Sequence, residues 1–346
     1  MIRYPGGRGE KAMDQVLDVS LTVDVEGDIN GAFMDSQRYR PLGEQAMWRR
    51  TKEGESLGLG YILQSLNQAE LTATFFLEVF QTHCFGLEPL KEAATAMEQA
   101  GQDIQLHLHP CWRVFSQTDW EKTWRGRSPA DTLVGLDDSL LDEQLAEAVE
   151  LFKQIVGRAP LAFRAGGLSV DLPVLQAVAR AGISLTSCVG SGYNWPSEPA
   201  LRGLVGGCHA VAGLLEVPVR SYRLFPWPTA PLRLLTIIGS TWQEMEAILE
   251  AAWRQQSGPV VILTHPSEFA SNQNLESPRF KANHQVRQRW QRLLAFLQEN
   301  RSRYRVTPFS QGANRWPNQP LGDQTVLSAP WATPLVRFWQ NRLSSS

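Results

Sequence analysis

The sequence has few cysteines, no excess of either charge and no long hydrophobic run. Its four cysteines are scattered over 346 residues and form no Cys-x-x-Cys pair, which argues against a disulfide framework. The 33 basic and 35 acidic residues nearly balance, so the charge favours neither nucleic acid nor an anionic membrane as a partner. No apolar stretch approaches the roughly 18 residues of a membrane-spanning helix. Since no signal-peptide pattern opens the sequence, we expect a cytoplasmic protein.

The sequence instead alternates between short apolar runs and amphipathic segments. Such alternation is typical of βαβ units around a parallel sheet or barrel. The expected strands are Leu17–Asp24, Leu71–Leu77, Asp103–His107, Leu161–Arg164, Ile183–Val189, Leu215–Val219, Val260–Thr264 and Tyr304–Thr307. The expected helices are Ser56–Gln68, Leu87–Ala100, Ser139–Val156, Leu172–Ala181, Trp242–Gln255 and Val286–Glu299.

The domain organisation follows from the same pattern. We expect a folded domain over residues 16–309, a polar N-terminal extension over residues 1–15 and a C-terminal tail over residues 310–346. Long loops follow three of the expected strands. Loops of such length are usually functional, and in (β/α) barrels the loops after the strands build the active site. These long loops are Gly27–Glu55, Pro110–Asp137 and Gly190–Gly213.

Side chains of catalytic and metal-binding types follow four of the expected strands. In chain order they are Asp24, Glu26, His107, His109, Cys111, Arg164 and His265. Taken singly, each has a structural explanation, because a carboxylate after a strand often caps a helix or forms a turn. A lone histidine is often structural as well, and a lone arginine often lies at the surface. Their occurrence at four strand ends, which meet at one end of a barrel, favours an active site.

The segments that carry these residues resemble, in the same order, the motifs of the polysaccharide deacetylases. These are the NodB-homology proteins of carbohydrate esterase family four. LTVDVEGD resembles the first motif, ATFFLEVF the second-strand signature and FRAGG the arginine motif. The run ending in IQLHLH resembles the segment that leads into the metal-binding histidines, LTSCV and EVPV resemble two later strands, and LTHPSEF resembles the final Leu-x-His motif. The resemblance covers roughly residues 17–309 and implies a distorted (β/α) barrel of the NodB type.

The resemblance also implies roles for individual residues. Asp24 would be the general base, His265 the general acid, and Arg164 would hold Asp24 ionised. Glu26 and His107 would bind a divalent metal together with a third ligand. A divalent ion with an open coordination position polarises a carbonyl and acidifies a bound water, and zinc is the metal we expect here.

Two departures from the family pattern affect the motifs. Val25 follows Asp24, so the usual adjacent pair of acidic residues is absent and Glu26 stands in for the second. FRAGG also lacks the proline that usually follows the arginine by two positions.

A third departure concerns the metal site. Cys111 occupies the position four residues after His107, where the family usually has histidine. It is either a thiolate ligand for zinc or a small buried residue in a site that has lost its metal. We expect only one of His107 and His109 to face the site, and His109 only if the backbone turns sharply before Pro110.

The leading functional hypothesis is removal of an N- or O-linked acetyl group from a sugar or glycan precursor. A second is hydrolysis of another C–N bond in a small-molecule amide by a metal-independent, allantoinase-like enzyme. A third is a non-catalytic carbohydrate-binding relative, although such a protein needs no acid, base or orienting arginine. Aromatic residues of the long loops either stack on sugar rings or plug the barrel; they are Trp48, Trp112, Trp120, Trp124, Tyr193 and Trp195.

Overall fold

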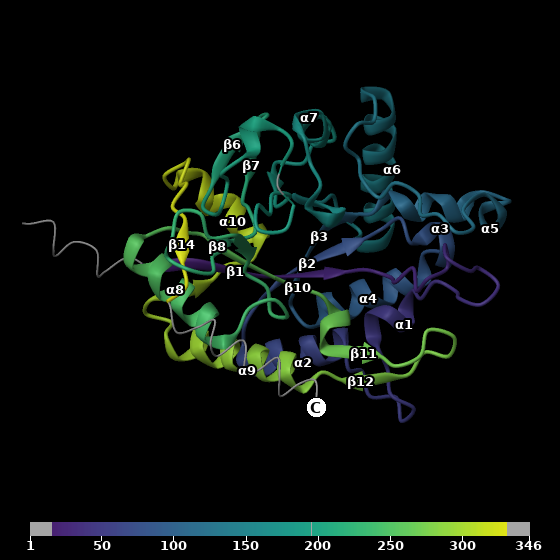
Figure 1. Ribbon diagram of the computed structural model, residues 1–346, viewed down its shortest axis with the longest axis horizontal. Helices are drawn as coiled ribbons and strands as arrows, with labels where there is room; N and C mark the ends of the chain where they lie inside the picture. Colours follow the sequence, from purple (N-terminus) through teal and green to yellow (C-terminus); the bar gives the residue numbers. More distant parts are fainter. Residues whose placement is uncertain (1–15, 195, 331–346) are drawn as a thin grey trace, which may run out of the picture.

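The computed structural model describes residues 16–194 and 196–330, and a sheet of mostly parallel strands curls through its centre (Figure 1). The strands follow the order β10-β1-β2-β3-β4-β5-β7-β6, and β13 also pairs with β1. Among the strands described in this sheet, only β6, next to β7, runs antiparallel to its neighbour. The bounds are β1 Leu17–Val25, β2 Thr74–Glu78, β3 Asp103–Leu108, β4 Ala162–Ala165, β5 Leu185–Thr186, β6 His209–Val211, β7 Leu214–Glu216, β10 Val260–Thr264 and β13 Tyr304–Val306.

Short contacts between the chain after β7 and β10 curl the sheet toward a barrel. Val219 forms an isolated bridge with Val261, and Thr236 forms one with Leu263. The backbone N–H of Arg220 also donates to the carbonyl of Val261 at 3.0 Å. Since these contacts are sparse, the barrel is distorted, as the family resemblance implied.

Amphipathic helices pack around the outer face of the sheet. The long ones are α2 Leu59–Ala69, α4 Glu88–Gln99, α6 Asp138–Val156, α7 Leu172–Arg180, α8 Trp242–Gln255 and α9 His284–Glu299. They correspond to the six expected helices, with ends that differ by a few residues. Their starts are set locally: the Thr241 hydroxyl accepts from the N–H of Glu244 at the start of α8, and the Glu244 carboxylate accepts in return. None of the helices described is both long and apolar enough to cross a membrane.

The remaining elements are short, and the sequence pattern did not predict them. The short helices are α1 Glu44–Trp48, α3 Thr82–Phe85, α5 Trp120–Thr123 and α10 Phe309–Arg315. The short strands form two small sheets, one of β11 Ala270–Asn272 and β12 Phe280–Ala282, the other of β8 Ser221–Arg223, β9 Leu232–Leu234 and β14 Leu327–Ser328. Elements of two to seven residues carry too few positions for a periodic pattern.

Strand β1 divides its side chains between the two faces of the sheet. Its odd-numbered residues, such as Val19 and Val23, are buried in the apolar cluster that also contains the helix side chains. The even-numbered Thr22 and Asp24 both bond to the buried Arg164 of β4. Because side chains alternate along a strand, Asp24 lies inside the barrel, at the carboxyl end of β1.

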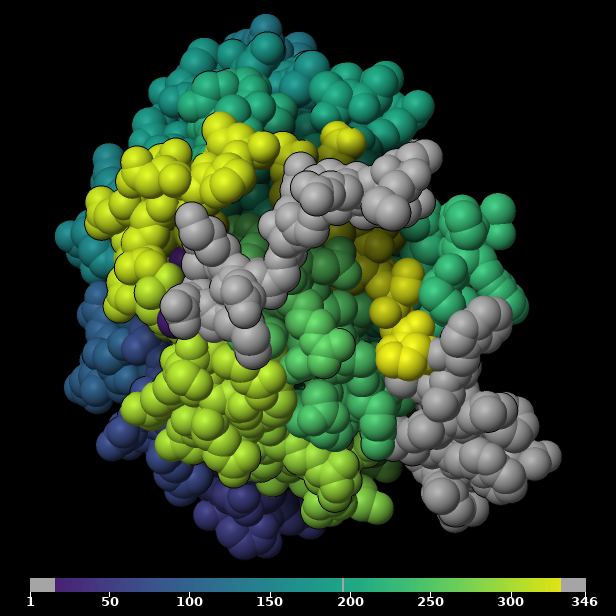
Figure 2. All heavy atoms as spheres, turned by 90° about the vertical axis from the view of Figure 1, so that its left-hand side faces the viewer, coloured from purple at the N-terminus to yellow at the C-terminus, as the bar shows by residue number. Residues whose placement is uncertain are grey.

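The chain after β13 packs against the opposite end of the barrel. The ring of Phe309 contacts Phe76 at 5.3 Å and Trp316 at 5.0 Å between centroids. The indole N–H of Trp316 donates to Asp18, near the start of β1, at 3.1 Å. Figure 2 shows this C-terminal segment in yellow against the teal and green parts of the chain. The domain limits drawn from the sequence stay a prediction.

Candidate active site

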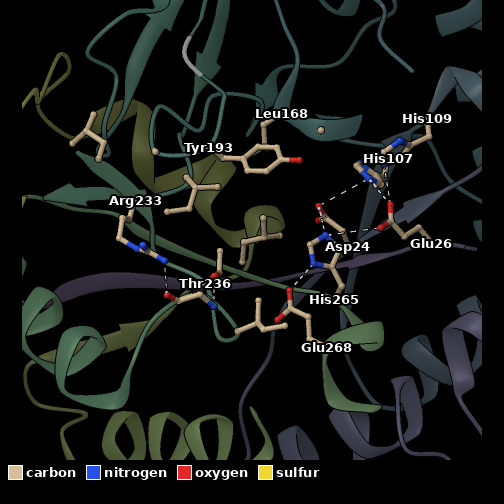
Figure 3. A pocket seen from close by; sticks show the side chains of 17 residues that line it. Asp24, Glu26, His107, His109, Leu168, Tyr193, Arg233, Thr236, His265 and Glu268 are labelled. Atoms are coloured by element: carbon tan, nitrogen blue, oxygen red, sulfur yellow. Dashed lines mark hydrogen bonds and ion pairs between the residues drawn. The ribbon is translucent and has the colours of Figure 1, made fainter. Parts of the chain in front are cut away.

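A cavity of about 520 Å³ opens at the carboxyl ends of the strands. Asp24, Glu26, His107, His109 and His265 line one part of it (Figure 3). The structure therefore brings together side chains from the carboxyl ends of three strands. Asp24 and Glu26 come from the end of β1, His107 and His109 from the end of β3, and His265 directly follows β10.

Arg164 is fully buried and holds Asp24 in place. Its Nη1 donates to Asp24 Oδ1 at 2.5 Å and to the Thr22 hydroxyl at 3.1 Å. Its Nε and Nη2 donate to the carbonyl and hydroxyl oxygens of Ser187 at 3.1 and 2.9 Å. Each side of the guanidinium thus has a partner, and its charge compensates that of the buried Asp24 carboxylate.

Glu26 lies between the two histidines at the end of β3. Its Oε2 is 2.9 Å from His109 Nε2 and 3.5 Å from His107 Nε2. These ligand-type atoms lie within 4.8 Å of one another, which suits three ligands of one metal ion. The expectation that only one histidine faces the site is wrong, because side chains two residues apart in an extended strand share a face. His109 continues β3 with extended backbone angles (φ −115°, ψ 104°), so no sharp turn is needed.

Each imidazole is oriented through its Nδ1 atom. His107 Nδ1 lies 2.9 Å from the backbone carbonyl of Arg164, and His109 Nδ1 lies 2.7 Å from Asp131 Oδ2. A histidine that donates from Nδ1 presents the lone pair of Nε2, as metal-binding histidines do. His107 Nε2 is moreover buried and has no hydrogen-bond partner. A metal ion would satisfy such an atom, so these residues fit a divalent cation.

Glu26 and His109 stabilise each other's charged forms. Burial alone would raise the pKa of Glu26, but the charge of His109, its hydrogen bond and the neighbouring His107 imidazole lower this pKa well below its usual range. Burial would lower the pKa of His109, but Glu26 and Asp131 raise it well above its usual range. The Glu26 carboxylate is therefore ionised, as a metal ligand must be, whereas His109 has to release its Nε2 proton when an ion binds.

Cys111 lies just outside the group of Glu26 and the two histidines. Its Sγ belongs to a second group of ligand-type atoms, formed with His109 and Asp131. It is the second residue of the 3-10 helix Pro110–Ser116 and is buried, and this burial raises the pKa of its thiol. A thiol with a raised pKa is protonated at neutral pH and so is a poor ligand until an ion displaces the proton. Metal binding by Cys111 stays a prediction.

His265 faces the metal-ligand group from the residue after β10, the strand that pairs with β1. Its Nδ1 lies 2.8 Å from Glu268 Oε1, and the Thr264 hydroxyl donates to Glu268 Oε2 at 2.7 Å. Its Nε2 is 3.8 Å from Asp24 Oδ2 and 4.0 Å from Glu26 Oε1. Burial would lower the pKa of His265, but the hydrogen bond to Glu268 and the surrounding carboxylates raise it to about 9. The imidazole is therefore a protonated acid at neutral pH.

Sequence reasoning missed the residues that orient these groups. Glu268 follows His265 within the LTHPSEF segment, so its position beside the predicted acid was a usable signal. Asp131 lies in the long loop before α6 and has no local pattern around it. Glu216, at the end of β7, is buried and accepts hydrogen bonds from the backbone N–H groups of residues 188 and 189.

Comparison with solved structures identifies proteins of similar fold, whereas comparison of sequences does not. No family model matches the sequence, and no curated protein sequence matches it significantly. Among solved structures, the chain is similar to one from Mycobacterium smegmatis that is provisionally assigned as a polysaccharide deacetylase. The two share 18% sequence identity over 94% of this chain and 96% of the other, with a TM-score of 0.55. The chain has the fold of a polysaccharide deacetylase.

Two further solved structures align less closely. A family 4 carbohydrate esterase from Streptomyces lividans, in complex with acetate, is 13% identical, with a TM-score of 0.39 over 83% of this chain and 90% of the other. A CE4 family pseudoenzyme from Bacillus anthracis is 12% identical, with a TM-score of 0.42 over 84% of this chain and 64% of the other. The similarity to the Mycobacterium smegmatis structure confirms, for the fold, the resemblance that the ordered motifs predicted.

Proposed function

We propose that this protein is a metal-dependent hydrolase that removes an N- or O-linked acetyl group from a sugar or glycan precursor. One observation carries the proposal: Asp24 faces both the candidate metal ligands and the candidate acid. Its Oδ2 lies 4.0 Å from His107 Nε2 and 3.8 Å from His265 Nε2. A base, a metal site and an acid are thus within reach of one small acyl group.

Glu26, His107 and His109 would hold the metal. Two imidazoles and one carboxylate form a common donor set for catalytic zinc, which leaves a coordination position open. The bound ion would polarise the scissile carbonyl and lower the pKa of a coordinated water. Cys111 is not needed for a three-ligand site, because His109 supplies the ligand that the family pattern would place at position 111.

The protein's own side chains would carry the proton transfers. Asp24 would accept a proton from the attacking water as the water oxygen bonds to the acyl carbon. Arg164 keeps the Asp24 carboxylate oriented through the 2.5 Å bond to Oδ1, which leaves Oδ2 directed toward the two imidazoles. His265 would donate its Nε2 proton to the leaving nitrogen or oxygen as the bond to the acyl carbon breaks. The products are acetate and a free amine or alcohol.

These features favour catalysis with metal over the other two hypotheses. The metal-independent hypothesis rested on the cysteine at position 111, and His109 now offers a third ligand. A binding protein without activity has no need for a raised histidine pKa at the end of a cavity, whereas a general acid does.

The proposed carbohydrate substrate has support from one aromatic side chain. Tyr193 lines the cavity and is 74% exposed, so its ring is available to stack on a sugar. Trp48 and Trp112 are instead buried in the core, and Trp195 lies outside the described residues.

The experiment is acetate release from a panel of N- and O-acetylated sugars by the zinc-loaded protein. Asp24→Asn and His265→Gln should each lower kcat by about 10²–10⁴-fold, the usual contribution of general acid–base catalysis. The exposed Asp119→Asn serves as the matched control and should leave kcat unchanged. Zinc-loaded wild type that releases no acetate from any sugar of the panel would disprove the proposed function.

A further inference from the structure

Arg233 lines the same cavity as Asp24 and His265 but lies apart from them. It belongs to β9, and Figure 3 shows its side chain on the other side of the cavity from Asp24 and His265. Its Nη2 donates to the carbonyl of Gly239 at 3.3 Å. Its Nε is buried and has no hydrogen-bond partner. Within residues 16–194 and 196–330, no carboxylate forms an ion pair with this guanidinium.

This lack of a carboxylate partner separates Arg233 from Arg164, the buried arginine that holds Asp24. Arg164 is saturated by Asp24, Thr22 and Ser187, and its charge is compensated. A buried donor without a hydrogen-bond partner destabilises the folded protein. A ligand bound in the cavity can supply the missing hydrogen bond. A guanidinium offers a planar fork of N–H groups that matches the oxygens of a phosphate or carboxylate.

The surrounding chain holds the Arg233 strand in place. Gly192 lies so close to it that a Cβ atom there would come within 2.2 Å of the Arg233 carbonyl carbon. Tyr193 directly follows Gly192, so its exposed ring and the strand that carries Arg233 belong to one wall of the cavity. The Gly239 N–H donates to the Thr236 hydroxyl at 2.8 Å, which fixes the turn that carries the carbonyl partner of Arg233.

The cavity therefore has two chemically different ends. Carboxylates gather at one end, where Asp24, Glu26 and Glu268 lie. Arg233 lies at the other, and apolar side chains including Leu168 and Ile238 line the wall as well. An anion bound at Arg233 would lie away from the carboxylates. At the catalytic end, these carboxylates would repel the anion and weaken its binding.

We propose that the substrate carries an anionic group, a phosphate or a carboxylate, that binds Arg233 while its acetyl group lies beside Asp24. This inference rests on the proposed deacetylation and narrows its substrate from any acetylated sugar to an acidic one. A neutral glycan would leave the guanidinium of Arg233 without a partner of opposite charge. Arg233 is thus a specificity-determining residue, and the reaction chemistry does not involve it.

The test is equilibrium binding, so that it does not depend on turnover. Zinc-loaded protein carrying Asp24→Asn is titrated with N-acetylglucosamine, N-acetylglucosamine 6-phosphate and N-acetylmuramic acid by calorimetry. The phosphate or the carboxylate sugar should bind about tenfold or more tightly than the neutral sugar, as expected of a charge-assisted hydrogen bond. Which of the two binds more tightly identifies the anion.

Substitutions at Arg233 then locate the effect. Adding Arg233→Gln should remove the preference for the acidic sugar and leave the Kd of the neutral sugar unchanged, while Arg233→Lys should retain part of the preference. Arg254→Gln, at an exposed arginine on α8, is the matched control. Equal Kd values for neutral and acidic sugars would overturn the inference. So would a preference that survives Arg233→Gln, because the anion would then bind at the metal end. Anion binding at Arg233 without acetate release by the wild type would instead refute the deacetylase proposal alone.

Discussion

Gly166 gives His109 the space that its imidazole occupies. A Cβ atom at residue 166 would lie 2.5 Å from His109 Nδ1, closer than such contacts allow. Gly166 is the first glycine of FRAGG, directly after β4, so one motif supplies both the arginine that holds Asp24 and the space for a candidate metal ligand. The arginine motif and the histidine segment, far apart in the sequence, are thus structurally coupled.

Gly166→Ala should therefore weaken metal binding. The new methyl group would displace the His109 ring, so we expect zinc affinity to fall by about tenfold or more, as when ligand orientation is lost. Competition with a chromogenic chelator measures it. Gly167→Ala is the control: its φ of +60° strains alanine, at a cost of about 1–2 kcal/mol, but no atom lies near its added Cβ. Equal losses of zinc affinity in both variants would contradict the role of Gly166.

Asp131 should increase the metal affinity of the protein although it is not one of the three proposed ligands, Glu26, His107 and His109. Its carboxylate accepts from His109 Nδ1, which orients the ring and increases the basicity of Nε2. Asp131→Ala should lower zinc affinity by about 10–100-fold, the usual effect of losing such a partner. Asp119→Ala, in the same long loop but exposed, should change nothing. Zinc affinity in Asp131→Ala that matches the wild type would refute the predicted role.

The pH dependence should report His265. This residue must be protonated to act as an acid, and its pKa of about 9 keeps it protonated at neutral pH. We therefore expect kcat/KM to fall as the pH rises through about 9. Glu268→Gln removes the hydrogen-bonded charge that raises this pKa, so the alkaline limb should move to lower pH. An alkaline limb that stays in place in this variant would mean that another group controls it.

Local patterns in the sequence were sufficient to predict eight of the nine strands of the central sheet, the long helices and the end of the barrel at which the site lies. Asp24 and His265 end or follow apolar runs, so their convergence could be predicted from barrel geometry alone. Asp131 and Arg233 could not be found this way, because each acts through a contact with a distant segment and has no flanking pattern. The two histidines at the end of β3 were misjudged for a simpler reason: two positions along a strand return a side chain to the same face.

The most direct test of the central claim is the zinc content of the purified protein and two variants after reconstitution. The claim is that Glu26, His107 and His109 hold the ion, so wild type and Cys111→Ser should each bind about one zinc per chain, as a three-ligand catalytic site does. His109→Ala should bind none, with the fold checked by circular dichroism. Zinc retained in His109→Ala but lost in Cys111→Ser would place the thiol in the site instead, and no zinc in the wild type would contradict metal dependence.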